Sequence, residues 1–180
     1  KGEAATLKFA ELLPTLAPFY DLLLIDTQGA RSVLLEMAVL ASNIALSPVT
    51  PEILAARELR RGTLQLIEDI GPYRHLGIEP PPLHLLINRV HPVSSNARLI
   101  QQTLRRMFQE QAGVQILDTD VPAIEAYPRA ATRGLPVHQV EFRQPAGRVA
   151  PSALMTMCTL AGELFPQWRE RFALVTGKSH

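Results

Sequence analysis

The sequence contains a single cysteine, Cys158, among its 180 residues. One cysteine excludes a disulfide within the chain and a metal site built from several cysteines. Cys158 stands in an apolar stretch with helical spacing, 154–160, where we expect a packed structural thiol and not a nucleophile. The five histidines are scattered without the HExxH spacing of zinc enzymes, so we assign no metal ligand among them.

The chain also lacks a charge excess and long apolar runs. A net charge of +1 gives no overall attraction to nucleic acid, so DNA binding needs a local basic patch. We find no signal-peptide pattern and no apolar run of membrane-spanning length, and therefore expect a cytoplasmic protein without a membrane partner. Hydrophobic residues make up 47% of the chain, which predicts one globular domain over residues 1–180.

The most informative stretch of the sequence covers residues 20–29. Four consecutive apolar residues, 22–25, suit a strand that is buried on both faces in a parallel sheet. The run stops at Asp26, shortly before Gly29, which permits a sharp turn. Because ligands bind at the carboxyl ends of strands in open α/β sheets, Asp26 is placed to hold Mg²⁺ directly or through water. This is the layout of a Walker B strand in a P-loop nucleotidase; the alternative is an aspartate that only caps the next turn.

Predicted strands and helices alternate along the chain. The apolar patterns predict strands at 22–26, 44–46, 83–87 and 114–117, and helices at 3–17, 32–41, 50–70, 96–112 and 152–165, with short helical pieces in the Pro- and Gly-rich segment 119–150. For the third helix we expect Thr50 as N-cap, Pro51 at the first position and an end at Gly71. The alternation predicts βαβ units, and so an α/β fold with a mostly parallel sheet flanked by helices.

Five short motifs follow one another at suitable spacing: Tyr20-Asp21 through Asp26-Thr27, Pro48-Val49-Thr50-Pro51-Glu52, Leu86-Ile87-Asn88-Arg89, Val121-Pro122 and Gly134-Leu135-Pro136-Val137. As an ordered set they resemble the ParA/MinD family of deviant-Walker ATPases, and are most similar to the ParA-type plasmid and chromosome partition proteins. The resemblance runs from about residue 3 to residue 165. It implies a P-loop NTPase-like fold with ATP and Mg²⁺ as cofactors.

The resemblance also implies roles for three residues. Asp26 matches the Walker B acid that orders Mg²⁺ through water. Asn88 matches the position that contacts the adenine base, and Pro122 lies in the segment whose backbone lines the adenine pocket. Each of the last two has a simpler alternative, because an asparagine can close a turn and a proline can start a short helix.

Two features depart from the family pattern. Gln28-Gly29 stands where the family has Pro-Pro, so the switch-like loop is expected to behave differently. The glycine-rich phosphate loop GKGGxGK[ST] is absent, and the resemblance places it, with the first strand and the strand of the catalytic acid, before Lys1. Because that loop and its lysine hold the phosphates, we expect this chain to be the C-terminal portion of an ATPase domain. By itself it is expected to contain no catalytic residue and to hydrolyse no ATP.

Further implications of the resemblance concern partners. Family members dimerise with ATP, bind DNA without sequence preference through basic residues, and release it when a ParB-like partner protein stimulates hydrolysis, which implies a nucleoid-associated bacterial or plasmid-borne protein. Arg98 and Arg105 are seven residues apart and share one helix stripe, which suits phosphate contacts. The candidate DNA-binding residues are Arg98, Arg105, Arg106, Arg129 and Arg133, with Arg143 and Arg148 as possible extensions. For any one of them, the alternative is a solvated helix face.

Two other functions remain open from the sequence. A MinD-like membrane helix at 167–175 has Trp, Phe and two arginines, but it is short and follows Pro166, so we do not favour it. A non-enzymatic module is the second hypothesis: the ParA-like fold is kept, and the chain binds DNA or a partner protein without nucleotide. A phosphate loop encoded upstream of Lys1 favours the ATPase, whereas a start codon at Lys1 favours the module.

Overall fold

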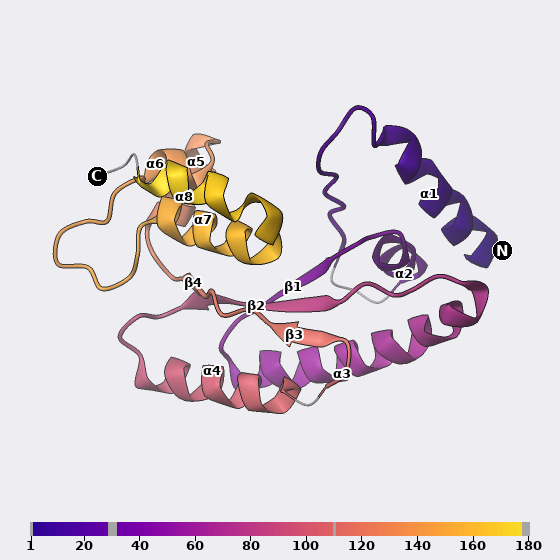
Figure 1. Cartoon of the computed structure of the whole chain (residues 1–180). Coiled ribbons are helices and arrows are strands. Elements are labelled where there is room, and N and C mark those ends of the chain that lie inside the picture. The colour runs from indigo at the N-terminus through magenta and orange to yellow at the C-terminus, as the bar shows by residue number, and fades with distance from the viewer. Residues whose placement is uncertain (1, 29–31, 110, 178–180) are drawn as a thin grey trace.

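The computed structural model describes residues 2–28, 32–109 and 111–177. A small parallel sheet lies at the centre, with helices on both of its faces (Figure 1). The elements in chain order are α1 (Gly2–Leu16), α2 (Val33–Leu40), β1 (Ala45–Val49), α3 (Ile53–Ile70), the 3₁₀ helix η1 (Gly71–Leu76), β2 (Leu83–Val90), α4 (Ser95–Phe108), β3 (Val114–Ile116), β4 (Val121–Pro122), α5 (Ala126–Arg133), α6 (Val137–Val140), α7 (Ala153–Leu164), the 3₁₀ helix η2 (Pro166–Trp168) and α8 (Arg169–Gly177).

Strand β2 is the centre of the sheet. It pairs in parallel with β1 along one side and with β3 along the other, so that Leu83 lies opposite both Ala45 and Val114. Its last residues pair with β4, where Asn88 lies opposite Val121. The predicted α/β architecture, a parallel sheet flanked by helices, is therefore confirmed.

The two faces of β2 bury different sets of side chains. Because successive side chains of a strand alternate between faces, Leu83, Leu85 and Ile87 point to the layer of α3 and α4, whereas Leu86 points to the layer of α5 and α7. The first layer contributes Ala56, Leu59, Leu104, Met107 and Phe108, and the second contributes Tyr127, Met157, Leu160 and Leu164. Burial on both faces explains why 85–87 is an unbroken apolar run.

Strand β1 is longer than predicted and continues through Pro48 to Val49. The Ala45 N–H donates to the Pro82 carbonyl at 3.2 Å, so Ala45, Ser47 and Val49 turn their backbone groups toward β2. Leu46 and Pro48 then turn theirs to the outer edge, where proline has no N–H to lose. The outer edge of β1 has no strand partner among the described residues.

The prediction of a strand at 22–26 was wrong, because this segment has no regular secondary structure. The side chains of Leu22, Leu23 and Leu24 are exposed, Leu24 at 85%, and that of Ile25 is half-buried. No backbone hydrogen bond joins 22–28 to another described segment. An apolar run becomes a strand only when a neighbouring strand satisfies its backbone groups, and among the described residues none lies beside it.

Several predicted element ends were also wrong. Helix α3 begins after Glu52, not after Thr50, because Glu52 N–H turns back to the Thr50 carbonyl at 2.8 Å. Its end at Ile70 agrees with the prediction, but Gly71 keeps a helical φ of −53° and the chain continues as η1 until Gly77, where φ is +78°. Helix α4 ends at Phe108, four residues earlier than predicted.

Candidate functional site at the carboxyl edge of the sheet

The structure places Asn88 and Pro122 at the same edge of the sheet. Asn88 lies opposite Val121. Val90, two residues further along β2, lies opposite Pro122, one residue further along β4. The Ala123 N–H donates to the Val90 carbonyl at 2.8 Å, which fixes the 121–123 backbone against β2. Sequence reasoning placed Asn88 just after its strand, whereas it is the sixth residue of β2. The two candidate base-binding residues are thus brought together on adjacent strands.

The backbone at Arg89 is unusual. Its φ of +59° is the only positive value among the described residues other than glycine, and an L-residue pays for this left-handed conformation in steric strain. The Asn88 side-chain oxygen accepts a hydrogen bond from the Arg89 N–H at 2.9 Å. The pairing of β2 with β4 shifts register at this residue. The left-handed conformation therefore changes the direction of the backbone at the sheet edge where ligands of α/β folds bind.

The local bond of Asn88 agrees with the turn-closing alternative for this residue. This hydrogen bond uses the side-chain oxygen of Asn88. The side-chain amide nitrogen has no hydrogen bond to any residue in the described part of the chain. An amide N–H is a donor, so Asn88 keeps a group that suits an acceptor on a ligand. The turn-closing and ligand-binding roles are therefore compatible in one side chain.

Asp26 is not at the end of a strand in the structure. It is an exposed residue of the irregular segment 20–28. Among the described residues, no three His, Cys, Asp or Glu side chains gather into a group that suits a metal ion. A protein-bound Mg²⁺ is usually held by one or two carboxylates together with substrate phosphates. The Mg²⁺ role of Asp26 therefore stays a prediction.

The candidate DNA-binding arginines do not form one surface. Helix α4, with Arg98, Arg105 and Arg106, packs on one face of the sheet, whereas α5, with Arg129 and Arg133, packs on the other. Figure 1 shows the same separation, with α4 below the sheet and α5 above it. All of these arginines except Arg105 are exposed.

Arg105 is occupied by an internal network. It donates to the Leu117 carbonyl at 2.9 Å and to Asp120 at 3.3 Å, while Gln101 donates to the other oxygen of Asp120 at 2.6 Å. Burial raises the pKa of Asp120, and the charge of Arg105 opposes that rise. Arg105 therefore ties α4 to the segment between β3 and β4.

The same segment is held from the opposite side by Glu163 of α7. Its carboxylate accepts the backbone N–H groups of Asp118 at 2.5 Å and Thr119 at 2.9 Å. Burial alone would raise the pKa of Glu163, but these hydrogen bonds lower it below its usual value. Sequence reasoning missed Glu163, because its two partners lie more than 40 residues away in the chain.

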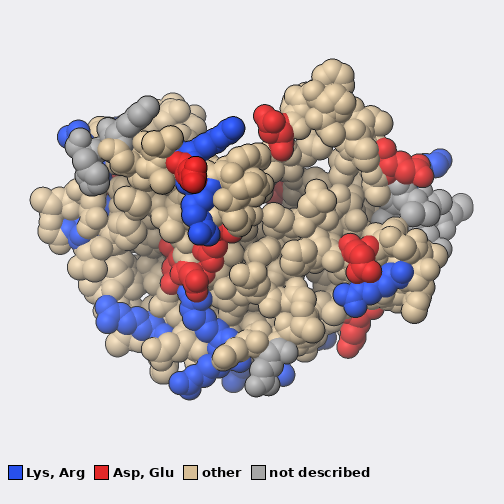
Figure 2. Space-filling model, viewed as in Figure 1, with Lys and Arg blue, Asp and Glu red and all other residues tan. Residues whose placement is uncertain are grey.

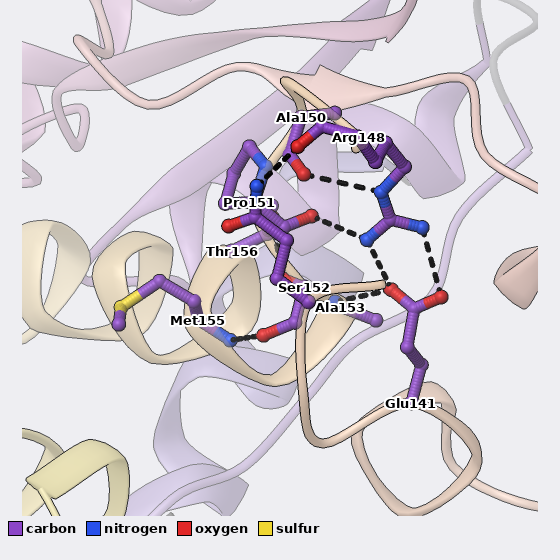
Figure 3. Close-up of polar contacts among 9 residues, drawn as sticks. Glu141, Arg148, Ala150, Pro151, Ser152, Ala153, Met155 and Thr156 are labelled. Atoms are coloured by element: carbon purple, nitrogen blue, oxygen red, sulfur yellow. Dashed lines mark hydrogen bonds and ion pairs between the residues drawn. The ribbon is translucent and has the colours of Figure 1, made fainter. Parts of the chain in front are cut away.

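Arg148 is also occupied internally, by a two-point ion pair with Glu141 (Figure 3). Its two terminal nitrogens donate to the two carboxylate oxygens at 2.9 and 2.6 Å, and Nε donates to the Ala150 carbonyl. One Glu141 oxygen also accepts the Ala153 N–H at the start of α7. The hydrogen bond from Arg148 is the main reason why the pKa of Glu141 is lowered. This ion pair of Glu141 with Arg148, the clamp, closes the loop between α6 and α7. The sequence alone shows only two opposite charges seven residues apart, which is too little to predict it.

Cys158 lines a hollow of about 380 Å³ between α7, α8 and the 118–119 segment. Glu163, Phe172 and Thr176 also line it. Burial raises the pKa of the Cys158 thiol, which disfavours the thiolate that a nucleophile needs. The side chain is half-buried, in line with the packed thiol expected from the sequence.

Comparison of the sequence with models of known protein families and with curated proteins gave no match. Among the helices of the described part of the chain, none is both long and apolar enough to cross a membrane. The candidate site therefore has to be argued from its own geometry.

Proposed function

We propose that this chain is the C-terminal part of a ParA-like partition ATPase and contributes the base-binding edge of its nucleotide site. The observation that carries the proposal is the pairing of Asn88 and Val90 with Val121 and Pro122. It brings the two residues implied in adenine binding onto one sheet edge, beside the strained backbone of Arg89. In the intact protein, ATP closes a homodimer, the dimer binds DNA, and a ParB-like partner protein stimulates hydrolysis to release it.

The unpaired strand edge supports the proposal. The outer side of β1 has no strand partner among the described residues, and the apolar residues 22–24 remain exposed. Unpaired edges expose backbone groups that readily take a further strand. Upstream strands that carry the phosphate loop would pair with this edge and give 22–26 the neighbour it lacks. Asp26 would then follow a strand at the nucleotide edge and order Mg²⁺ through water.

The chain by itself is a non-catalytic piece under this proposal. Phosphoryl transfer depends on positioning and on stabilising phosphate charge, and the residues that do both belong to the missing phosphate loop. ATP turnover should therefore be undetectable for residues 1–180 and appear in the protein that includes the upstream segment. Turnover by residues 1–180 that is lost on Asp26→Ala would overturn the proposal.

A non-enzymatic module that binds DNA or a partner protein without nucleotide is the second candidate. The observation that favours it is the set of exposed arginines on α4, which needs no phosphate loop to attract an anion. The two functions differ in one measurement: the affinity of the intact gene product for DNA depends on ATP in the first and is indifferent to ATP in the second.

A further inference from the structure

The segment that leads from β3 into β4 is anchored to β2 at both of its ends. The Leu117 N–H donates to the Leu85 carbonyl at 2.9 Å, and the Ala123 N–H donates to the Val90 carbonyl at 2.8 Å. The two acceptors are five residues apart on β2, which is about 16 Å. A fully extended chain from 117 to 123 reaches at most about 20 Å, so this segment is close to its full length. A shift in its middle is therefore passed on to its end at the candidate base-binding edge.

Glu163 holds the middle of this segment. Each of its two carboxylate oxygens accepts one backbone N–H, from Asp118 at 2.5 Å and from Thr119 at 2.9 Å. Hydrogen bonds to an ionised acceptor are about twice as strong as neutral ones. Glu163 is the second-last residue of α7, and α7 packs against Leu86 and Val121 of the sheet. The carboxylate is thus carried by an element that the core fixes.

Helix α4 holds the same segment through different groups. Arg105 and Gln101 donate to the side chain of Asp120, and Arg105 also donates to two backbone carbonyls. In the described part of the chain, Glu163 is the one side chain that accepts the N–H groups of 118 and 119. Figure 2 shows acidic and basic side chains gathered where α7 and α8 meet the sheet and α4. Loss of Glu163 would therefore free these N–H groups and leave the Arg105 network in place.

We infer that Glu163 is a positioning residue of the base-binding edge. By holding the backbone at 118–119, it places Pro122 against Asn88 and so sets the preference of the site for adenine over guanine. Adenine presents an amino group where guanine presents a carbonyl oxygen, and groups that are placed to pair with one reject the other. The inference rests on the proposed function, because it assigns a role within the same nucleotide site. No contact with the nucleotide is assigned to Glu163 itself.

The first test asks whether Glu163 acts on the edge. Glu163→Ala removes both acceptors and keeps a good helix former in α7. Amide hydrogen exchange, followed by NMR, compares it with Leu59→Ala, a control that loses a core side chain of α3 on the other face of the sheet. Both variants should lower overall stability. Only Glu163→Ala should speed exchange of the Ala123 N–H more than exchange of amides in the middle of β2. Equal speeding of both would overturn the inference, because the edge is then held without Glu163.

The second test measures base preference in the gene product that includes the upstream segment, by titration with fluorescent ATP and GTP analogues. Glu163→Ala should weaken ATP binding about five- to ten-fold and change GTP binding less, so that the preference for ATP falls. Glu163→Gln keeps the side-chain length but offers one acceptor oxygen to two donors. It should fall between Glu163→Ala and the unsubstituted protein, and it is the variant to read if Glu163→Ala does not fold.

Two controls separate this role from general effects. Glu170→Gln removes the same charge from an exposed position on α8, and Leu59→Ala weakens the core without touching the 117–123 segment. Both should keep the ATP preference of the unsubstituted protein. A loss of preference of the same size in Leu59→Ala would overturn the inference, because destabilisation alone then explains the result.

Failure of the inference and failure of the proposed function are distinguishable. If the unsubstituted gene product prefers ATP and Glu163→Ala keeps that preference, the inference is overturned and the proposed function stands. If the unsubstituted gene product binds neither nucleotide, or if no upstream segment is encoded, the proposed function fails and the base-preference role of Glu163 fails with it.

Discussion

Arg105 donates a hydrogen bond to Asp120 at 3.3 Å and a second one to the Leu117 carbonyl at 2.9 Å. The guanidinium therefore holds the segment between β3 and β4 against α4. In the sequence, Arg105 and Arg106 are adjacent and equally basic, and both were assigned to DNA. The structure separates them, because Arg106 is exposed and has no ion pair with another described residue.

We predict that substitutions of these two neighbours differ in their effect on stability. Arg105→Ala should lower the free energy of unfolding by about 1 to 3 kcal/mol, because half-buried Asp120 loses its cationic partner. Arg106→Ala should change it by less than about 0.5 kcal/mol. Urea unfolding of the two variants measures both values. Equal destabilisation would mean that the network around Asp120 contributes nothing specific.

The clamp between Glu141 and Arg148 predicts a pH-dependent stability. The folded pKa of Glu141 is lowered from its usual 4.5, so the clamp stabilises fully above that pH and the contribution is lost as pH falls through the folded pKa. Glu141→Gln should cost about 2 to 4 kcal/mol at pH 7, because Arg148 loses its partner in a largely buried setting. The difference from the unsubstituted chain should shrink at pH values below 4.5.

The exposed pair of Glu79 with Arg74 provides the control for this prediction. Glu79→Gln removes the same charge from a pair whose side chains are mostly in solvent, and should change stability by less than about 1 kcal/mol. Thermal unfolding across the acid range compares the two variants. A Glu141→Gln penalty that stays constant down to pH 3 would contradict the role given to the ionised carboxylate.

The left-handed backbone at Arg89 gives a third prediction. Arg89→Gly should leave stability within about 1 kcal/mol, because glycine adopts a positive φ without steric cost. Arg89→Val should be less stable than Arg89→Gly by more than about 1 kcal/mol, since a β-branched side chain fits this conformation poorly. Urea midpoints of the two variants decide the matter. If both are equally stable, φ at this position is not +59° in solution.

Asn88 gives a prediction about the nucleotide itself. In the gene product that includes the upstream segment, Asn88→Ala should weaken ATP binding about ten-fold or more and reduce the preference for ATP over GTP, because an amide that pairs with the base is lost. Binding of fluorescent analogues of both nucleotides measures this. Unchanged selectivity would leave Asn88 with its turn-closing bond to Arg89 alone.

The fold class was predictable from sequence. The irregular structure of 22–26 and the side-chain networks of Arg105, Arg148 and Glu163 were not. The apolar patterns of α2, α7 and β2 are local signals, so those elements were found from sequence. The structure adds that Ser32 and Ser152 cap α2 and α7 with their side chains. The run 22–25 is equally apolar, yet it is irregular, because strand formation depends on a neighbour that local sequence does not report.

The candidate site was predicted in part. The family resemblance implied that Asn88 and Pro122 both lie at the adenine base, whereas the strand β4 that pairs Pro122 with β2 was not predicted. The partners of Arg105, Arg148 and Glu163 depend on how helices pack against loops. A charged residue that faces an internal acid is indistinguishable in sequence from one that faces solvent.

The central claim is that this chain completes the nucleotide site of a partition ATPase. The most direct measurement is to read the coding DNA upstream of Lys1. The account predicts an in-frame glycine-rich loop with two lysines, on a segment that would pair with the outer edge of β1. A start codon at or just before Lys1, with no such loop upstream, would contradict it and leave a DNA- or partner-binding module without nucleotide.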